Sequence, residues 1–215
     1  MKHVTRFLES RPLDPTIDEI RTALNHYQET QIYNPDQHIA PQAYHHDYRA
    51  AAVLIPIYHC PHTDQLQVLL TQRALHMRNH PGQIAFPGGK HDPEDASIQY
   101  TALRETMEEV GLTPDCFDLL GQLGEYCSIS GFCIQPVVAE VIRLSELSLS
   151  VDEVDSVHWV PLQHLLDPRN FRYVEREIGA LKRGFFEIHF EGLRIWGVTA
   201  GIIFGLYQAI ENHSR

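Results

Sequence analysis

Long apolar runs and a signal sequence are both missing from this chain. No stretch approaches the ~20 consecutive apolar residues that cross a bilayer. Residues 1–11 lack the apolar segment of a secretory signal. We therefore expect a cytoplasmic protein that does not span a membrane.

Cysteine is also scarce. Four cysteines occur in 215 residues, and none forms a Cys-x-x-Cys pair with another. This is too few for a disulfide scaffold, and the spacings fit no common zinc pattern. The sequence thus predicts reduced thiols and no structural zinc.

Basic residues are outnumbered, since 17 Lys and Arg face 28 Asp and Glu for a formal net charge of −11. A nonspecific nucleic-acid or anionic-membrane binder needs a basic surface, so the composition argues against both. A small anionic substrate stays open, because local arrangement can oppose the total. The length fits one domain, or one domain with an extension.

Residues 1–48 are predicted to form an N-terminal helical arm, and residues 49–215 the main domain. In the arm, Thr16 and Glu19 form a capping box ahead of apolar residues at helical spacing. We expect the arm to pack on the body or on a partner chain. The remaining signals place strands within 50–58, 66–71, 84–86, 119–124, 133–141, 156–160 and 185–196, and helices at 92–111 and 199–210. Strands on both sides of a central helix predict an α/β or α+β layered domain.

The central helix carries an unusual group of acids. Asp92 is the expected N-cap with Pro93 at the first helical position, and Gly111 is the expected stop. Apolar residues at steps of four and three predict one buried stripe, formed by Ala96, Tyr100, Leu103, Met107 and Val110. At about 100° per residue, Glu105, Glu108 and Glu109 then share the face opposite the core.

Two interpretations of these acids stay open. They form a solvated acidic helix face, or they hold Mg²⁺ or Mn²⁺, which prefer carboxylate, water and phosphate oxygens. Residues 65–91 contain no acid but carry Arg73, Arg78 and Lys90. A cationic segment beside a carboxylate cluster favours a metal-bridged polyphosphate site, although chance charge segregation on a surface loop gives the same pattern.

The segment Arg104-Glu105-Thr106-Met107-Glu108-Glu109-Val110-Gly111-Leu112 resembles the second half of the Nudix box. Thr106 stands where the pattern has a larger apolar residue. In the first half, Gly89 and Asp95 each lie one residue earlier than the usual spacing, which an extra residue before Arg104 explains.

The upstream stretch is more specific. Leu69-Leu70-Thr71-Gln72-Arg73-Ala74, Arg78, His80, Gly82-Gln83 and Ala85-Phe86-Pro87-Gly88-Gly89 look like the motif of the coenzyme A pyrophosphatase branch of Nudix hydrolases. Further matches are Ser130-Gly131-Phe132, the segment from Glu153 to Leu162, and Trp196-Gly197-Val198-Thr199-Ala200-Gly201. The resemblance spans roughly residues 50–205.

The resemblance implies an α/β/α sandwich around a mixed sheet, with the box forming a loop–helix–loop motif. It implies divalent-metal-dependent hydrolysis of coenzyme A and its derivatives to 3′,5′-ADP and 4′-phosphopantetheine. Alternatives are a Nudix hydrolase of ADP-ribose, NADH or dinucleoside polyphosphates, a catalytically silent ligand-sensing module, and a structural protein with an acidic helix. The expected partner is a small nucleotide of the coenzyme A type and not a nucleic acid, and the sequence leaves the choice between monomer and homodimer open.

Residue roles follow from the charges and the resemblance together. Glu105 and Glu109 are the expected principal metal ligands, and Glu108 adds a ligand or orients the attacking water. Glu153 is the first candidate for a base or further ligand from outside the box, and Glu140 is the second.

The remaining assignments concern orientation and substrate. Arg104 is expected to pair with a neighbouring carboxylate and fix the helix. Gly82, Gly88 and Gly89 would allow close backbone approach. The candidates for binding the substrate phosphates are Arg73, Arg78, His80 and Lys90, with Gly88 and Gly89 beside them.

Overall fold

The computed structural model describes residues 7–29, 31–39, 47–77, 79–178 and 181–213. Its largest element is a mixed sheet with the core order β3-β2-β1-β7-β5, in which β1 and β7 run parallel and β1 and β2 antiparallel. Shorter strands add to this path: β4 pairs with β1, β6 with β7 and β8 with β2. The strands are β1 (Arg49–Cys60), β2 (Gln65–Arg73), β3 (Ile84–Ala85), β4 (Gly88–Lys90), β5 (Phe117–Gln122), β6 (Tyr126–Cys127), β7 (Phe132–Val141) and β8 (Val154–Pro161).

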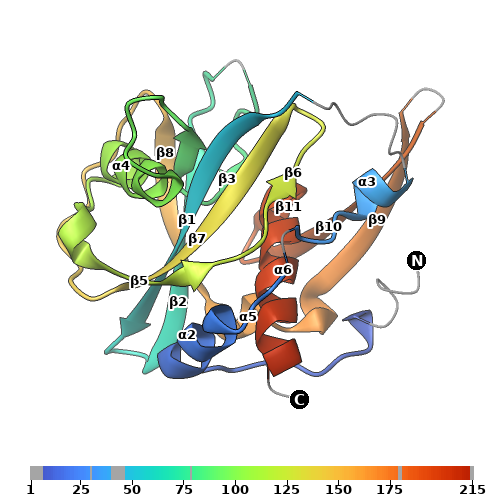
Figure 1. Cartoon of the computed structure of the whole chain (residues 1–215), viewed down its shortest axis with the longest axis horizontal. Coiled ribbons are helices and arrows are strands. Elements are labelled where there is room, and N and C mark those ends of the chain that lie inside the picture. Colours follow the sequence, from blue (N-terminus) through green and yellow to red (C-terminus); the bar gives the residue numbers. More distant parts are fainter. Residues whose placement is uncertain (1–6, 30, 40–46, 78, 179–180, 214–215) are drawn as a thin grey trace.

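Helices cover both faces of this sheet (Figure 1). Alternate residues of β1 point to opposite sides: Ala52 and Leu54 join the core under α4 (Ile98–Val110), whereas Ile55 and Ile57 join the core shared with α6 (Val198–His213). The layers confirm the predicted α/β/α sandwich with a mixed sheet and exclude a segregated α+β arrangement.

A second sheet of three strands lies beside α6 and was only partly predicted. Its order is β11-β10-β9, with β9 (Phe171–Ile178), β10 (Leu181–Phe190) and β11 (Leu193–Trp196). The sequence indicated β10 and β11 but not β9, whose charged residues hide the alternation. Phe186 of β10 is fully buried and packs 4.9 Å from Phe204 of α6, centroid to centroid.

The N-terminal segment packs on the body of the domain. In α2 (Ile17–Asn25), Thr16 and Glu19 form the predicted capping box. Arg21 pairs with Asp118 of β5 at 2.8 Å, and Ile20 is fully buried in the core around α6. The remaining short helices are α3 (Pro35–Ile39), α5 (Leu162–Leu165), η2 (Pro114–Cys116) and η3 (Pro168–Asn170). Within the described residues, no helix is long and apolar enough to cross a bilayer.

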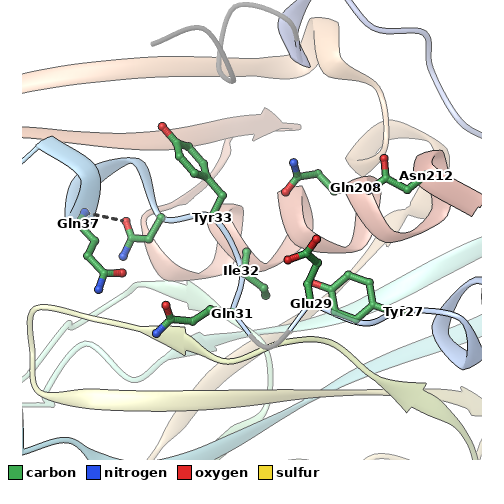
Figure 2. Close-up of a pocket in the computed structure, with 9 residues that line it drawn as sticks. Tyr27, Glu29, Gln31, Ile32, Tyr33, Gln37, Gln208 and Asn212 are labelled. Carbon is green, nitrogen blue, oxygen red and sulfur yellow. Dashed lines mark hydrogen bonds between the residues drawn. The ribbon is translucent and has the colours of Figure 1, made fainter.

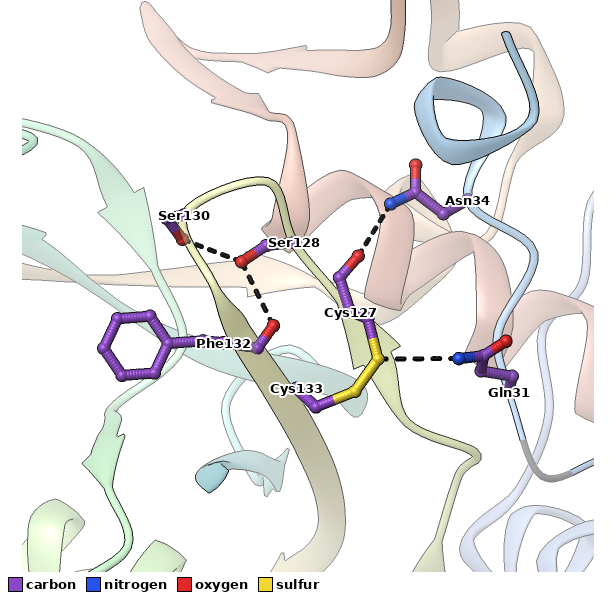
Figure 3. The surroundings of a disulfide bond; sticks show 7 residues. All are labelled: Gln31, Asn34, Cys127, Ser128, Ser130, Phe132 and Cys133. Atoms are coloured by element: carbon purple, nitrogen blue, oxygen red, sulfur yellow. Dashed lines mark hydrogen bonds between the residues drawn. A yellow bond between two sulfur atoms is a disulfide. The ribbon is translucent and has the colours of Figure 1, made fainter. Parts of the chain in front are cut away.

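Cys127 and Cys133 are joined in a disulfide (Figure 3), so the prediction of reduced thiols is wrong for this pair. The two residues are direct partners in the antiparallel pairing of β6 with β7, and their Cα atoms lie 4.0 Å apart. Asn34 donates to the carbonyl of Cys127 at 2.9 Å, which ties the N-terminal segment to this hairpin. Cys60 and Cys116 are free.

Candidate active site

Helix α4 begins at Ile98 with Ser97 as its N-cap, so the predicted start at Asp92 is wrong. The Ser97 hydroxyl accepts a hydrogen bond from the Tyr100 amide at 3.1 Å. Residues 92–95 instead form a turn, in which the Asp92 amide donates to the Asp95 carboxylate at 3.0 Å. The helix ends as predicted at Gly111, whose φ of 80° is left-handed.

The buried face of α4 also differs from the prediction. Tyr100 and Met107 are 45% and 39% exposed, and Ala96 is exposed as well. The residues that face the sheet are Thr101, Ala102, Thr106, Glu109 and Val110. The expected apolar stripe is therefore wrong at Ala96, Tyr100 and Met107, whereas Val110 is buried and Leu103 is partly buried against the same core. The three glutamates do not share a solvent face.

Glycines let α4 approach the sheet closely. Gly89 pairs with Ala52 of β1 and lies against the carboxyl group of Glu105. A Cβ atom on Gly88 would collide with the Ala52 carbonyl and with Val53. Gly89 thus leaves the space in which Glu105 enters the gap between helix and sheet, whereas Gly88 lets β4 pair closely with β1.

Glu109 is buried, at 4% exposure. Its Oε2 atom has no hydrogen-bond partner among the described residues. Burial raises the pKa of Glu109 to about 8, while the charge of Arg73 and a hydrogen bond from the Gly88 backbone act in the opposite direction. A buried carboxylate oxygen without a partner is costly on its own, and a bound divalent cation would satisfy it.

Glu105 and Glu108 complete the carboxylate cluster, which we define as Glu105, Glu108 and Glu109. The Glu105 side chain is 16% exposed and the Glu108 side chain 52%. Burial raises the pKa of Glu105, against the opposing effect of its hydrogen bond from Arg104. The cluster therefore runs from buried to solvent-facing, with oxygen donors of the kind that Mg²⁺ and Mn²⁺ prefer.

Arg104 holds the cluster in place through Asp95. Its Nε and NH2 atoms donate to the two Asp95 oxygens at 2.8 and 2.9 Å, and NH1 donates to Glu105 at 3.0 Å and Glu108 at 3.1 Å. Hydrogen bonds from Arg104 hold the pKa of Asp95 well below its usual range. The buried Thr101 hydroxyl adds a bond to Asp95 at 2.8 Å. The sequence indicated Arg104 as an orienting residue but did not identify Asp95 as its partner. Asp95 was not recognised because it lies one residue earlier than the usual spacing of the motif.

Glu153 lies near the cluster and Glu140 does not. Glu153 is exposed, its carbonyl accepts from the Ala74 amide at 2.9 Å, and its charge raises the pKa of both Glu105 and Glu109. Glu140 pairs with Ile57, five positions along β1 from Ala52. At about 3.4 Å per residue, Ile57 lies roughly 17 Å along β1 from Ala52, the residue that pairs with Gly89. The structure therefore does not bring Glu140 to the cluster.

Two of the four predicted phosphate-binding residues, Arg73 and Lys90, lie beside this gap. Arg73 ends β2 with its charge acting on Glu109, and Lys90 ends β4 with an exposed side chain and a carbonyl that accepts from Arg104 at 3.3 Å. His80 is exposed with a φ of 54° in the following loop. Arg78 lies outside the described residues.

A cavity of about 150 Å³ opens beside the loop that follows Arg73. His80 and Gln83 line it from this loop, and Ser130, Trp196 and Val198 line it from distant parts of the chain. The hydroxyl of Thr199 donates to the Ile84 carbonyl at 3.1 Å, which fixes the start of α6 against β3. The sequence indicated the segments around His80, Ser130 and Trp196 separately. It did not predict that they line one cavity.

A second cavity, of about 410 Å³, lies between the N-terminal segment and α6 (Figure 2). Amide side chains and tyrosines dominate its described lining, including Gln208 and Asn212 of α6 and Tyr27. Glu29 is the single carboxylate of that described lining. None of the predicted site residues contributes to it, so the carboxylate cluster is the better candidate for catalysis.

The chain is similar to several known proteins. A NUDIX domain model matches residues 48–181. The chain belongs to the Nudix family. A Salmonella newport protein named uncharacterized Nudix hydrolase NudL is 36% identical over 189 residues, which cover 87% of this chain and 94% of that protein. A Yersinia enterocolitica protein of the same name is 39% identical over 160 residues, with 74% and 80% covered. The solved MutT protein from Methanosarcina mazei aligns over 78% of this chain and 96% of that one, with 18% identity and a TM-score of 0.49.

Family membership makes this chain a Nudix hydrolase that acts on the pyrophosphate bond of a nucleoside diphosphate derivative. Nudix hydrolases generally need divalent metal ions. The residues present fit such an ion, because Glu109 offers an unpartnered buried oxygen and Glu105 lies beside it.

Proposed function

We propose that this protein is a divalent-metal-dependent pyrophosphohydrolase that cleaves coenzyme A and its derivatives to 3′,5′-ADP and 4′-phosphopantetheine or its acyl form. One observation carries the proposal. Residues of the motif resembling the coenzyme A branch, from Arg73 to Gly89, border the carboxylate cluster, and its late segment around Trp196 shares a cavity with His80.

The carboxylate cluster is the proposed metal centre, with Glu105 and Glu109 as principal ligands and Glu108 as a further one. When bound, Mg²⁺ or Mn²⁺ neutralises pyrophosphate charge and lowers the pKa of water. The protein contributes to catalysis by holding charged side chains in fixed positions. Arg104, locked on Asp95, holds Glu105 and Glu108 in fixed positions, so little reorganisation is needed when the substrate arrives.

Glu153 is the proposed general base. It is exposed, and its charge acts electrostatically on Glu105 and Glu109, which supports placing its carboxylate beside a water at the cluster. In this role it accepts the proton of the water that attacks one phosphorus, while the other phosphate leaves.

The substrate phosphates are assigned to Arg73, Arg78, Lys90 and His80. Coenzyme A carries a 3′-phosphate in addition to its pyrophosphate, so several cations suit it better than a substrate with two phosphates only. Gly88 and Gly89 admit a phosphate close to the backbone. A cytoplasmic location stays a prediction from the sequence.

A substrate panel tests this proposal. The full-length protein is incubated with Mg²⁺ or Mn²⁺ and, separately, coenzyme A, ADP-ribose, NADH or a diadenosine polyphosphate, and products are resolved by chromatography. We expect the highest kcat/KM for coenzyme A, with 3′,5′-ADP and 4′-phosphopantetheine as products. Preference for ADP-ribose overturns the specificity, and no cleavage of any compound favours a ligand-sensing module.

A further inference from the structure

Just over half of the residues that line the 150 Å³ cavity lie outside the Nudix match. Phe185 and Trp196 follow residue 181, and Asn34 precedes residue 48. Parts that a family shares carry its common chemistry, whereas a particular substrate is distinguished by the site built around them. A wall made of segments outside the family match is therefore the place to seek recognition of the substrate's distinctive part.

The cavity has an aromatic wall and little free charge. The rings of Phe185 and Trp196 lie 5.5 Å apart, centroid to centroid, tilted by 56°. Arg183 and Asp36, which also line it, are paired with each other in an ion pair and are mostly buried. Apart from His80, the described lining residues add no other charged group. Such a cavity suits a flat, neutral group and not a phosphate.

Gln83 gives this cavity a hydrogen-bonding edge. Its side chain makes no hydrogen bond to any other described residue, whereas its backbone is fixed by a bond from the Gln83 amide to the His80 carbonyl at 3.2 Å. A primary amide presents a donor beside an acceptor, which matches the N6 amino group and N7 of adenine. A guanine or hypoxanthine base offers two acceptors at that edge and matches only in part.

The backbone of Arg73 connects this cavity to the carboxylate cluster. The Arg73 amide donates to the Gln83 carbonyl at 3.0 Å, and the Gly82 amide donates to the Arg73 carbonyl at 3.0 Å. Arg73 in turn acts electrostatically on Glu109. A nucleotide with its base beside Gln83 can therefore direct its diphosphate past Arg73 to the cluster.

We propose that this cavity binds the adenine of the nucleotide substrate, stacked on Trp196 beside Phe185 with its edge on Gln83. The proposal rests on the proposed function only in requiring an adenine nucleotide as substrate. The pantetheine arm of coenzyme A has nearly twice as many non-hydrogen atoms as adenine and no flat ring, so it suits a 150 Å³ aromatic cavity less well.

Equilibrium binding of AMP and of 4′-phosphopantetheine to the full-length protein tests this assignment. Base stacking on an aromatic side chain predicts that Trp196→Ala weakens AMP binding by about 5- to 150-fold. Trp196→Phe should retain most of the affinity, and 4′-phosphopantetheine binding should stay within about twofold of wild type. Phe190→Ala is the matched control, because Phe190 lies on the same sheet, packs against His164 at 4.9 Å and does not line the cavity.

A second variant, Gln83→Ala, tests whether the cavity distinguishes adenine from other bases and leaves the aromatic wall unchanged. We expect wild type to bind AMP more tightly than IMP, and Gln83→Ala to remove that preference. The assignment is overturned if wild type does not bind AMP, if Trp196→Ala leaves AMP affinity unchanged, or if it weakens 4′-phosphopantetheine binding instead.

The two proposals fail separately. If the wild type cleaves ADP-ribose but not coenzyme A while Trp196 still sets AMP affinity, the coenzyme A assignment is wrong and the adenine site stands. If coenzyme A is cleaved while Trp196→Ala and Gln83→Ala bind AMP as wild type does, the adenine site is wrong and the function stands.

Discussion

Gly89 of β4 lies directly against the carboxyl group of Glu105 on α4, so that a Cβ atom at residue 89 would be 2.5 Å from Cδ of Glu105. The contact couples a glycine of the upstream motif to a glutamate of the catalytic helix. Glu105 is also held by Arg104 at 3.0 Å. It therefore cannot move aside without breaking that bond.

Gly89→Ala should lower kcat/KM by about 100-fold, because a displacement of about 1 Å at a reacting centre costs that much. The melting temperature should change little, since residue 89 is not in the left-handed region. Gly192→Ala is the contrasting control: its Cβ meets nothing within 4 Å but its φ is 85°. That variant should lose stability and keep activity, and a reversal of the two patterns would contradict the role of the Gly89 contact.

Asp95→Asn should weaken metal binding and lower activity by about 10- to 100-fold, as loss of an outer-shell partner typically does. Asn cannot match the charge-assisted bonds that Asp95 receives from Arg104, so Glu105 and Glu108 lose their fixed support. Titration with Mn²⁺ measures the affinity. Asp92→Asn, in the same turn but exposed, is the control; equal effects of both variants would remove Asp95 from this positioning role.

The metal-free protein should become less stable as pH rises from about 4.5 to about 8. Burial raises the pKa of folded Glu109 to about 8 from 4.5, so across this window the folded state keeps a proton that the unfolded chain has lost. The free energy of unfolding should fall by roughly 1 kcal/mol per pH unit. Denaturant unfolding in EDTA measures it, and Glu109→Gln should flatten the slope. An unchanged slope in that variant would show that another group is responsible.

Arg73→Ala should raise KM for coenzyme A by about 10-fold, the size of one lost charge-assisted contact. If Arg73 contacts the 3′-phosphate, KM for 3′-dephospho-coenzyme A should rise less. Steady-state kinetics on the two substrates separates the cases, with Lys90→Ala as a second cationic variant. Equal increases would assign Arg73 to the pyrophosphate only.

The layers of the fold could be predicted from the sequence because most strands alternate in the usual way. Ile55 and Ile57 of β1 face one core and Leu54 the other, and Gly111 ends α4 where its backbone becomes left-handed. β9 was missed because its charged residues obscure that alternation. The disulfide was missed because a spacing of six residues does not reveal direct cross-strand pairing.

The sequence indicated which residue types form the candidate site. It gave the wrong orientation for helix α4. The helical-wheel argument assumed that Tyr100 and Met107 face the core, whereas the side chains next to the sheet are small or acidic, such as Thr106 and Glu109. A helix that presents ligands to its own sheet must place polar groups inward, which hydrophobic periodicity cannot detect. Neither the anchoring of Arg104 by Asp95 nor the shared cavity of Gln83 and Trp196 has a local signal in the sequence.

The most direct test concerns Glu109 itself. Hydrolysis of coenzyme A with Mn²⁺ is measured for wild type, for Glu109→Gln and for Glu94→Gln, which changes an exposed acid just before the helix. We predict that Glu109→Gln lowers kcat/KM by at least about 100-fold, while Glu94→Gln stays within twofold of wild type. Undiminished turnover by Glu109→Gln would contradict the assignment of the buried carboxylate to the metal centre.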